Sequence, residues 1–358
     1  MVTDTREIRV SALALVVSAA FMLAVLASGR VPPGDFAALL GVYVQSFTNL
    51  WLVVGAIGLF IHCGRRTHTD GRLVSPFAVI RDWLAMRWQR DRLLGVVTPP
   101  LVCMIALASF NGFKQMLLPD AGFGMDALFA DLDRALFLGN EPWVVTHDLL
   151  GSVAATNAID AFYHGWFVPM ALGIIVVAFI SDATLRLQYA LSYLLMWIII
   201  GCGLAWLLPS AGPCYYEAFH ADPRFAELMA RLTSADAALK AGGGDGIAAL
   251  LNQEALLANF GRPVLALGGG ISAMPSMHNA MSVLFALGAM RMNRWLGAAM
   301  WVYAFVIWIG SIHLGWHYAL DGVVAAVATL AIWQGCGLWL RRMAAAETRI
   351  ANIAVPAE

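Results

Sequence analysis

The sequence predicts an all-α membrane protein with about eight transmembrane helices. Composition is the first reason: 60% of the 358 residues are hydrophobic and 13% are charged, whereas soluble domains carry roughly 25% charged residues. The mean hydropathy of +0.73 agrees with this. The second reason is that the apolar residues gather in runs of about 20, the length that a helix needs to cross the hydrocarbon core of a bilayer.

Eight such runs follow one another along the chain. They cover roughly residues 9–29, 36–63, 94–112, 160–181, 186–208, 276–292, 295–315 and 317–340. The sixth run is the shortest. The first run follows Arg6 and Arg9, as the apolar part of a signal peptide would, but it is longer than the ~7–15 residues of such a segment. We therefore expect an uncleaved membrane anchor.

The basic residues predict the orientation of these helices. With the N-terminus in the cytoplasm, 15 of the 22 Lys and Arg residues fall on the cytoplasmic side and 7 on the outer side, although the outer loops are longer. Because positive residues are retained on the cytoplasmic side, we expect both termini there. Arg makes up 20 of the 22, which favours a GC-rich bacterial genome and hence the inner (plasma) membrane of a bacterium. The net charge of -1 gives no reason to expect nucleic acid as a partner.

Three parts follow from this pattern. Residues 1–93 hold two spans and, over 78–93, a basic amphipathic helix on the inner membrane surface, which either anchors the chain or binds anionic lipids. Residues 94–340 form the membrane domain that carries the candidate site, and 341–358 form a cytoplasmic tail.

Two outer segments are long enough to hold structure of their own. The first, 113–159, contains amphipathic pieces from Met125 to Leu138 and from Trp143 to Gly151. The second, 209–275, is the longest loop, and we expect helices in it near 222–240 and 246–260. Loops of this length are usually functional or disordered. The second segment is therefore either a lid over the site or a spacer on the membrane surface.

Two short motifs near the C-terminus carry the candidate chemistry. The second of them holds His317 and Asp321, four residues apart, so that on a helix they share a face. Asp321 can accept the proton on one ring nitrogen of His317 and leave the other nitrogen free to attack phosphorus. A carboxylate and an imidazole at membrane depth are expensive, which makes them a functional-site hypothesis by default.

The first motif, Met274-Pro275-Ser276-Met277-His278, precedes the sixth apolar run. The start of a helix favours an anion, so Ser276 is expected to be both the N-cap and a phosphate ligand. His278 is then placed to donate a proton to a leaving oxygen. His313, one turn before His317, is either a supporting group or structural, and His164 is expected to be structural, with Asp160 as an N-cap.

These motifs, Pro-Ser-x-His followed by His-x-x-x-Asp, resemble the type 2 phosphatidic acid phosphatase superfamily. The resemblance implies that His317, linked to Asp321, is the nucleophile and that His278 protonates the leaving group. It implies no metal and no cofactor. The five cysteines agree, because they show no Cys-x-x-Cys spacing and indicate neither a zinc site nor a disulfide framework.

Two departures from the family pattern are informative. Gly310-Ser311 stands where the family has Ser-Arg, and the Lys-x6-Arg-Pro motif is absent, with Lys114 and Arg262 each offering part of it. These departures, with the pair His317-Tyr318, resemble the inositol phosphorylceramide synthase branch. The similarity extends loosely over residues 110–325. The candidate substrate contacts are therefore Ser276, Lys114, Arg262, Ser311, His313 and Tyr318.

Three functions remain open. The first is a lipid phosphotransferase that moves a phosphoryl head group from a donor lipid to a lipid or alcohol acceptor such as a ceramide. The second is a lipid phosphate or polyprenyl diphosphate phosphatase, which uses the same site with water as the acceptor. The third is a non-enzymatic protein that binds a metal through His313, His317 and Asp321, holds haem through paired histidines, or conducts ions along a polar path. The departures favour transfer.

Overall fold

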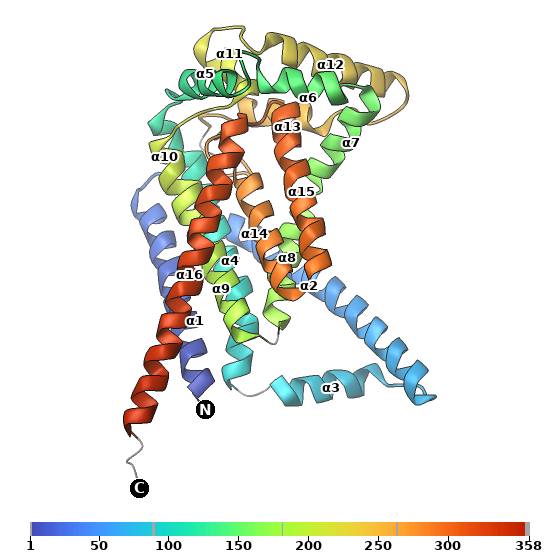
Figure 1. Ribbon diagram of the computed structural model, residues 1–358, viewed down its shortest axis with the longest axis vertical. Coiled ribbons are helices and arrows are strands. Elements are labelled where there is room, and N and C mark those ends of the chain that lie inside the picture. Colours follow the sequence, from blue (N-terminus) through green and yellow to red (C-terminus); the bar gives the residue numbers. More distant parts are fainter. Residues whose placement is uncertain (1, 88–89, 181, 263, 355–358) are drawn as a thin grey trace.

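The computed structural model describes residues 2–87, 90–180, 182–262 and 264–354, and every regular element in these ranges is helical. The all-α prediction is therefore confirmed. Figure 1 shows long helices running between two ends of the molecule. Both termini lie at the lower end, and a layer of shorter helices covers the upper end.

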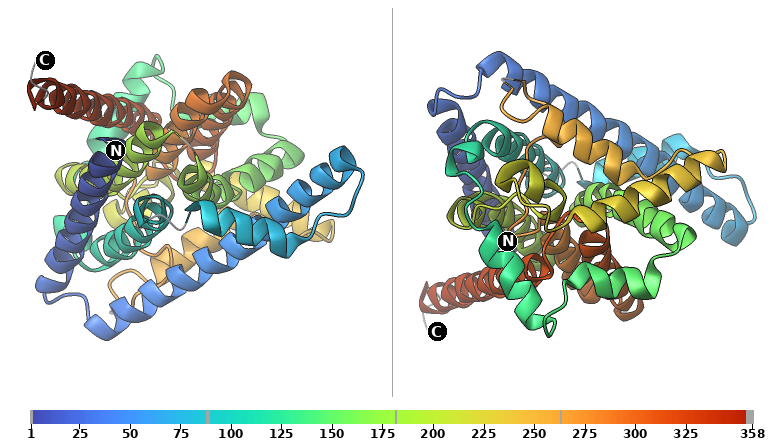
Figure 2. Two further views of the ribbon diagram at one scale, coloured as in Figure 1. Left: turned by 90° about the horizontal axis from the view of Figure 1, so that it is seen from below. Right: turned by 90° about the horizontal axis from the view of Figure 1, so that it is seen from above.

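The long helices form the bundle. They are α1 (Val2–Ala27), α2 (Pro33–Asp70), α4 (Arg90–Met116), α8 (Phe167–Phe179), α9 (Ala183–Ile198), α14 (Met277–Met292), α15 (Arg294–His313) and α16 (Ala319–Ala354). A π-helix, η2 (Ile199–Leu204), and the short α10 (Ala205–Leu207) continue α9. Seen along the bundle, α2 and α16 lie on opposite sides (Figure 2).

Seven helical stretches in the described residues are long and apolar enough to cross a membrane. They are Arg6–Ala27, Pro33–Asp70, Val97–Met116, Val153–Ala178, Ala183–Leu207, Arg294–His313 and Ala319–Arg349. They match seven of the eight expected spans. The remaining one, 276–292, corresponds to α14, whose 16 residues fall short of the about 20 that a full crossing needs. It packs instead against α9, α15 and α16 in the middle of the bundle.

The shorter helices confirm the amphipathic pieces expected in the outer segments. They are η1 (Leu118–Ala121), α5 (Asp126–Leu136), α6 (Pro142–Leu150), α7 (Val153–His164), η3 (Pro213–Tyr215), α11 (Tyr216–His220), α12 (Ala226–Ala241) and α13 (Ala248–Ala258). Most of them form the upper layer of Figure 1. At the lower end, α3 (Pro76–Arg87) covers part of the expected basic helix and lies across the bundle; Trp88 of that helix is outside the described residues.

Side-chain caps fix where several helices begin. Ser276, Asn293 and Asp182 each accept main-chain N–H bonds at the starts of α14, α15 and α9. The start of α7 is capped by Ser152, whose hydroxyl accepts the N–H of Ala155. The expected cap by Asp160 is wrong, because the helix begins two turns earlier than its apolar run suggests.

Candidate active site

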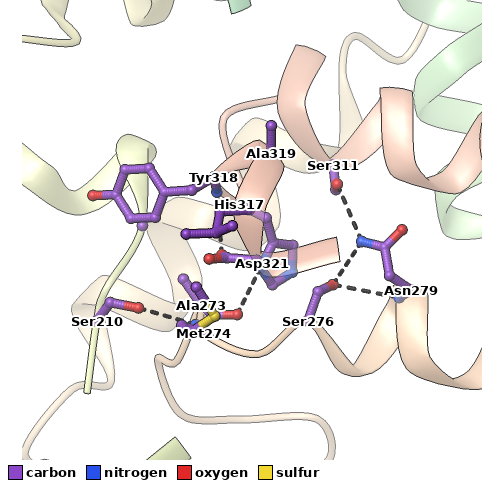
Figure 3. A network of polar contacts seen from close by, with 12 residues as sticks. Ser210, Ala273, Met274, Ser276, Asn279, Ser311, His317, Tyr318, Ala319 and Asp321 are labelled. Atoms are coloured by element: carbon purple, nitrogen blue, oxygen red, sulfur yellow. Dashed lines mark hydrogen bonds and ion pairs between the residues drawn. The ribbon is translucent and has the colours of Figure 1, made fainter. Parts of the chain in front are cut away.

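His317 lies in the short connection between α15 and α16, and Asp321 lies in the first turn of α16. The Nδ1 atom of His317 is 2.9 Å from the carbonyl oxygen of Ala273 and 3.2 Å from Oδ2 of Asp321 (Figure 3). Both partners are acceptors, so Nδ1 carries the proton and donates it. In the neutral ring the other nitrogen, Nε2, then keeps its lone pair.

Asp321 is fully buried and is held by the turn that precedes it. Its Oδ2 also accepts the main-chain N–H of Tyr318 at 3.1 Å. The carboxylate therefore sits at the start of a helix, where the dipole favours a negative charge. This bond fixes the carboxylate against the ring of His317.

The pKa of His317 is lowered to about 3, mainly because the ring is buried. The hydrogen bond to Ala273 acts to raise the pKa, and the positive charge of Lys114 acts to lower it. The ring is therefore neutral at physiological pH. A neutral imidazole with a free Nε2 is the form that can act as a nucleophile.

His278 lies in the first turn of α14 and faces the ring of His317, with 6.3 Å between the ring centroids. Two aromatic rings hold it: Tyr163 stacks on it at 4.7 Å, and Trp166 lies at 4.3 Å. The indole N–H of Trp166 also donates to the carbonyl oxygen of His278 at 3.1 Å. The two motifs are thus brought to one place, with their imidazole rings tilted at 57° to each other.

A cavity of about 560 Å³ lies beside both histidines. Residues from α2, α4, α7, α8, η2, α13 and the loop before α14 form its walls. Much of the lining is apolar or aromatic, including Phe47, Leu107, Phe110, Met170 and Trp197. Because α2 contributes to the wall, the cavity is lined by residues of both the expected N-terminal part, 1–93, and the expected membrane domain, 94–340.

Lys114, near the end of α4, is the single Lys or Arg among the described residues that line this cavity. The loop before α14 packs against it, since a Cβ on Gly270 would come within 3.0 Å of Lys114 Cγ. Gln115 fastens the same loop, because its amide donates to the carbonyl of Ala266 at 2.8 Å and accepts the N–H of Ala266 at 2.9 Å. The loop and α4 together set the position of this cation.

Two expected phosphate contacts, Ser276 and Ser311, are fully buried and do not belong to the described cavity lining. The side-chain amide of Asn279 joins them, donating to Ser276 Oγ at 2.9 Å and to Ser311 Oγ at 3.3 Å (Figure 3). Ser276 is also the N-cap of α14, as expected. Their hydroxyl groups hold α14 to α15.

The other expected contacts also lie away from the lining. Arg262 is exposed in the loop after α13. The ring of His313 stacks on His147 at 3.9 Å, and its Nε2 lies 3.0 Å from Thr156 Oγ1. It does not converge with His317, and among the described residues no group of three His, Cys, Asp or Glu side chains could hold a metal ion.

Tyr318 points away from the cavity to a carboxylate that the sequence did not suggest. Its hydroxyl donates to Asp126 Oδ1 at 2.8 Å. Asp126 also accepts the main-chain N–H groups of Ala211 and Gly212, and its Oδ2 lies 3.0 Å from Nε2 of His220. One buried carboxylate therefore ties the loop after α10 to the residue beside His317.

Asp133, about two turns after Asp126 on the same buried face of α5, plays a similar part. It accepts the N–H groups of Ala319 and Leu320 at 2.6 and 3.0 Å and so caps the start of α16 from another helix. The sequence does carry a signal for Asp126 and Asp133: both lie on the same face of the amphipathic helix α5 as the buried Phe129. A carboxylate on the apolar face of such a helix indicates a buried polar contact.

Asp160 acts in the same way on α13. It lies inside α7 and accepts the N–H groups of Ala248 and Ala249 at 2.8 and 3.0 Å. It therefore caps a distant helix rather than its own.

A family model described as the PAP2 superfamily matches residues 127–334, which is more than half of the chain. The matched range includes both histidine motifs and Asp133. No curated protein and no solved structure matches the chain.

Proposed function

Because the chain belongs to the PAP2 superfamily, and is therefore a helical membrane enzyme of the phosphatase and phosphotransferase type, we propose that it is a lipid phosphotransferase that works through a phosphohistidine on His317. The observation that carries the proposal is the placement of three groups on one cavity. His317 offers a free Nε2, His278 faces it at 6.3 Å between ring centroids, and Lys114 supplies positive charge.

In the first half-reaction, Nε2 of His317 attacks the phosphorus of the donor lipid. The N–P bond forms as the bond from phosphorus to the leaving oxygen breaks. Burial holds the pKa of His278 well below its usual range in the free protein, so His278 takes up a proton from solvent when the negatively charged head group binds, and then gives that proton to the leaving oxygen. Lys114 offsets the charge on the phosphoryl oxygens. Asp321 and the carbonyl of Ala273 keep the proton on Nδ1, so the ring attacks through Nε2.

In the second half-reaction, the oxygen of the acceptor alcohol attacks phosphorus. His278, now neutral, takes the hydroxyl proton, and the N–P bond breaks with its electron pair returning to Nε2 of His317. The site is then ready for a second donor. This order predicts ping-pong kinetics.

The cavity supports lipid substrates because it is amphipathic. Its lining combines Lys114 and the two histidines with apolar side chains such as Phe47, Leu50 and Phe110. Lys114 and the histidines suit a phosphorylated head group, and the apolar side chains suit an alkyl chain. The motif resemblance to the inositol phosphorylceramide synthase branch makes a ceramide or another lipid hydroxyl the preferred acceptor.

Hydrolysis at the same site is the second candidate. Asn252 and Asn259, on and just after α13, line the cavity and are exposed, so water reaches its rim. Against this, α13 belongs to the long outer segment 209–275 and forms part of the wall. That placement supports a role in excluding water from the phosphoenzyme.

We further propose that both termini are cytoplasmic and that the site faces the outer side. Both termini and α3 lie at the end of the molecule opposite the upper layer of helices (Figure 1). The positive-inside distribution supports the same orientation. A reporter fused to the C-terminus that is active only outside the cytoplasm would contradict it.

The decisive experiment is to trap the phosphoenzyme. Purified protein is incubated with phosphatidic acid carrying a labelled phosphate, quenched in alkali and separated by electrophoresis. We expect alkali-stable, acid-labile label on the wild type, none on His317→Ala, and normal labelling of His68→Ala, which changes an exposed histidine on α2. Equal labelling of wild type and His317→Ala would refute the proposal.

A further inference from the structure

A third histidine, His164, lines the same cavity and is held by a carboxylate of its own. It ends α7, one turn after Asp160. Its Nδ1 lies 3.0 Å from the carbonyl oxygen of Asp160 and 3.1 Å from Oδ1 of the same residue. The catalytic proposal does not use this pair.

The partners of His164 determine what its free nitrogen offers. Because both neighbours of Nδ1 are oxygen acceptors, Nδ1 carries the proton and Nε2 is an acceptor. The amide nitrogen of Asn252, on α13, lies 2.7 Å from Nε2 and donates to it. The side chain of His164 is 27% exposed, and Asn252 is exposed at the rim. A ligand can therefore reach the hydrogen bond between them.

The wall around this pair is rigid. Asp160 is buried and binds the first N–H groups of α13, which fixes that helix on α7. The backbone of Asn252 is thus held beside His164 before any ligand arrives, while its exposed side chain can still turn. Holding the backbone in place lowers the ordering cost of binding.

The charge of the lining limits what this wall can bind. Among the described residues that line the cavity there is no Asp or Glu, and the cation is Lys114 on α4 rather than a group beside His164. An imidazole acceptor and carboxamide groups from Asn252 and Asn259 suit a neutral ligand that both donates and accepts hydrogen bonds. A hydroxyl group does both.

Building on the proposed function, we propose that His164 and Asn252 form a subsite for a neutral hydroxyl-bearing group of a substrate. The exposed amide of Asn252 turns aside, and the hydroxyl takes its place beside His164, donating to Nε2 of His164 and accepting from the turned amide. The ring of Tyr163 contacts both this subsite and the proposed catalytic pair: its centroid is 6.3 Å from that of His164 and 4.7 Å from that of His278. The hydroxyl belongs either to the head group of the donor or to the acceptor alcohol.

The test measures binding, so it does not depend on turnover. Full-length protein in detergent is titrated by calorimetry with three short-chain lipids: phosphatidic acid, which has no head-group alcohol; phosphatidylglycerol, which has one; and diacylglycerol, a neutral acceptor alcohol. The variants are His164→Leu and Asn252→Leu, with His68→Leu as the control. Asn252→Leu leaves the contacts of Asp160 to α13 in place, so it separates loss of the subsite from loss of the fold.

We expect both variants to weaken one hydroxyl-bearing lipid about tenfold or more and to leave phosphatidic acid within about twofold. If only the binding of phosphatidylglycerol weakens, the subsite holds the donor head group. If only the binding of diacylglycerol weakens, the subsite holds the acceptor. Unchanged binding of all three lipids, or an equal loss for all three, would overturn the inference. The phosphoenzyme experiment on His317 decides the proposed function separately.

Discussion

His317 and Ala273 share a hydrogen bond of 2.9 Å, shorter than the 3.2 Å contact between His317 and its carboxylate. The segment that carries Ala273 is fixed in turn, because the N–H of Ala273 donates to the carbonyl of Ser210 and the N–H of Met274 donates to Ser210 Oγ. The ring of His317 therefore has two independent acceptors for its Nδ1 proton. One is a side chain four residues away, and the other is main chain from a distant loop.

This double support predicts a graded effect of Asp321→Asn. Where a carboxylate alone fixes the tautomer of a catalytic histidine, the amide substitution lowers kcat by about 10⁴. Here the carbonyl of Ala273 still accepts the Nδ1 proton, so we expect a smaller fall, of about 10–10², and continued labelling of His317. Steady-state rates and the phosphoenzyme trap measure both. Complete loss of labelling would show that the carbonyl does not hold the tautomer.

Lys114 gives a prediction with a matched control, since the chain contains one other lysine. We expect Lys114→Met to lower kcat/KM for phosphatidic acid by about tenfold or more, because the cavity then lacks its cation. Lys240→Met should have little effect, as Lys240 is exposed on α12 and paired with Asp236. Arg262→Ala should resemble the Lys240 variant. A larger loss of activity in Arg262→Ala than in Lys114→Met would show that Arg262, not Lys114, binds the phosphate.

Ser276→Ala separates a helix cap from a phosphate ligand. The hydroxyl of Ser276 is buried and accepts bonds from Asn279. We therefore expect the variant to lose about 1 kcal/mol of stability, as other N-cap deletions do, with KM for the donor unchanged. Thermal unfolding and kinetics check the two halves. A rise in KM without a loss of stability would contradict this assignment.

Asp133 predicts how stability depends on pH. Burial raises its pKa to about 7, with the N–H bonds from Ala319 and Leu320 acting to lower the pKa and the nearby carboxylates of Asp321 and Glu141 acting to raise it. In the unfolded chain the pKa is about 3.9, so the folded state holds this proton more tightly. The contribution of Asp133 to stability is therefore largest below about pH 4 and declines as the pH rises to about 7.

Thermal unfolding of the wild type and of Asp133→Asn between pH 4 and 8 measures this contribution. We expect the wild type to lose stability relative to the variant across that window, while the control Asp245→Asn, at an exposed loop position, follows the wild type. Parallel curves for the wild type and Asp133→Asn would show that the buried carboxyl does not titrate in this range.

The sequence predicted what depends on short spacing. His317 and Asp321 are four residues apart on the chain, so their contact could be inferred before the structure. The amphipathic outer helices followed from their periodicity in the same way. The run 276–292 predicted the bounds of α14 to within one residue, but not that the helix is too short to cross a membrane and packs inside the bundle, because hydrophobicity alone does not distinguish contact with lipid from contact with other helices.

Contacts that depend on chain path could not be predicted. Nothing in the sequence around Ala273 indicates that its carbonyl oxygen accepts a hydrogen bond from His317. Lys114 and Arg262 were equal candidates by charge alone, and only the packing of α4 places one of them on the cavity. The same reason explains Asp160, which looked like a cap of its own helix and instead caps α13.

The buried aspartates also bear on how this protein is made. Asp126 and Asp133 are translated long before Tyr318 and Ala319, from which they are separated by 192 and 186 positions. Until those residues are in place, Asp126 lacks the hydroxyl of Tyr318, and Asp133 lacks the two main-chain N–H groups that compensate its burial. A chain that stops before residue 317 therefore loses more than the proposed nucleophile. It keeps a buried carboxyl group without these donors in its outer layer, and we expect cellular proteolysis to remove it.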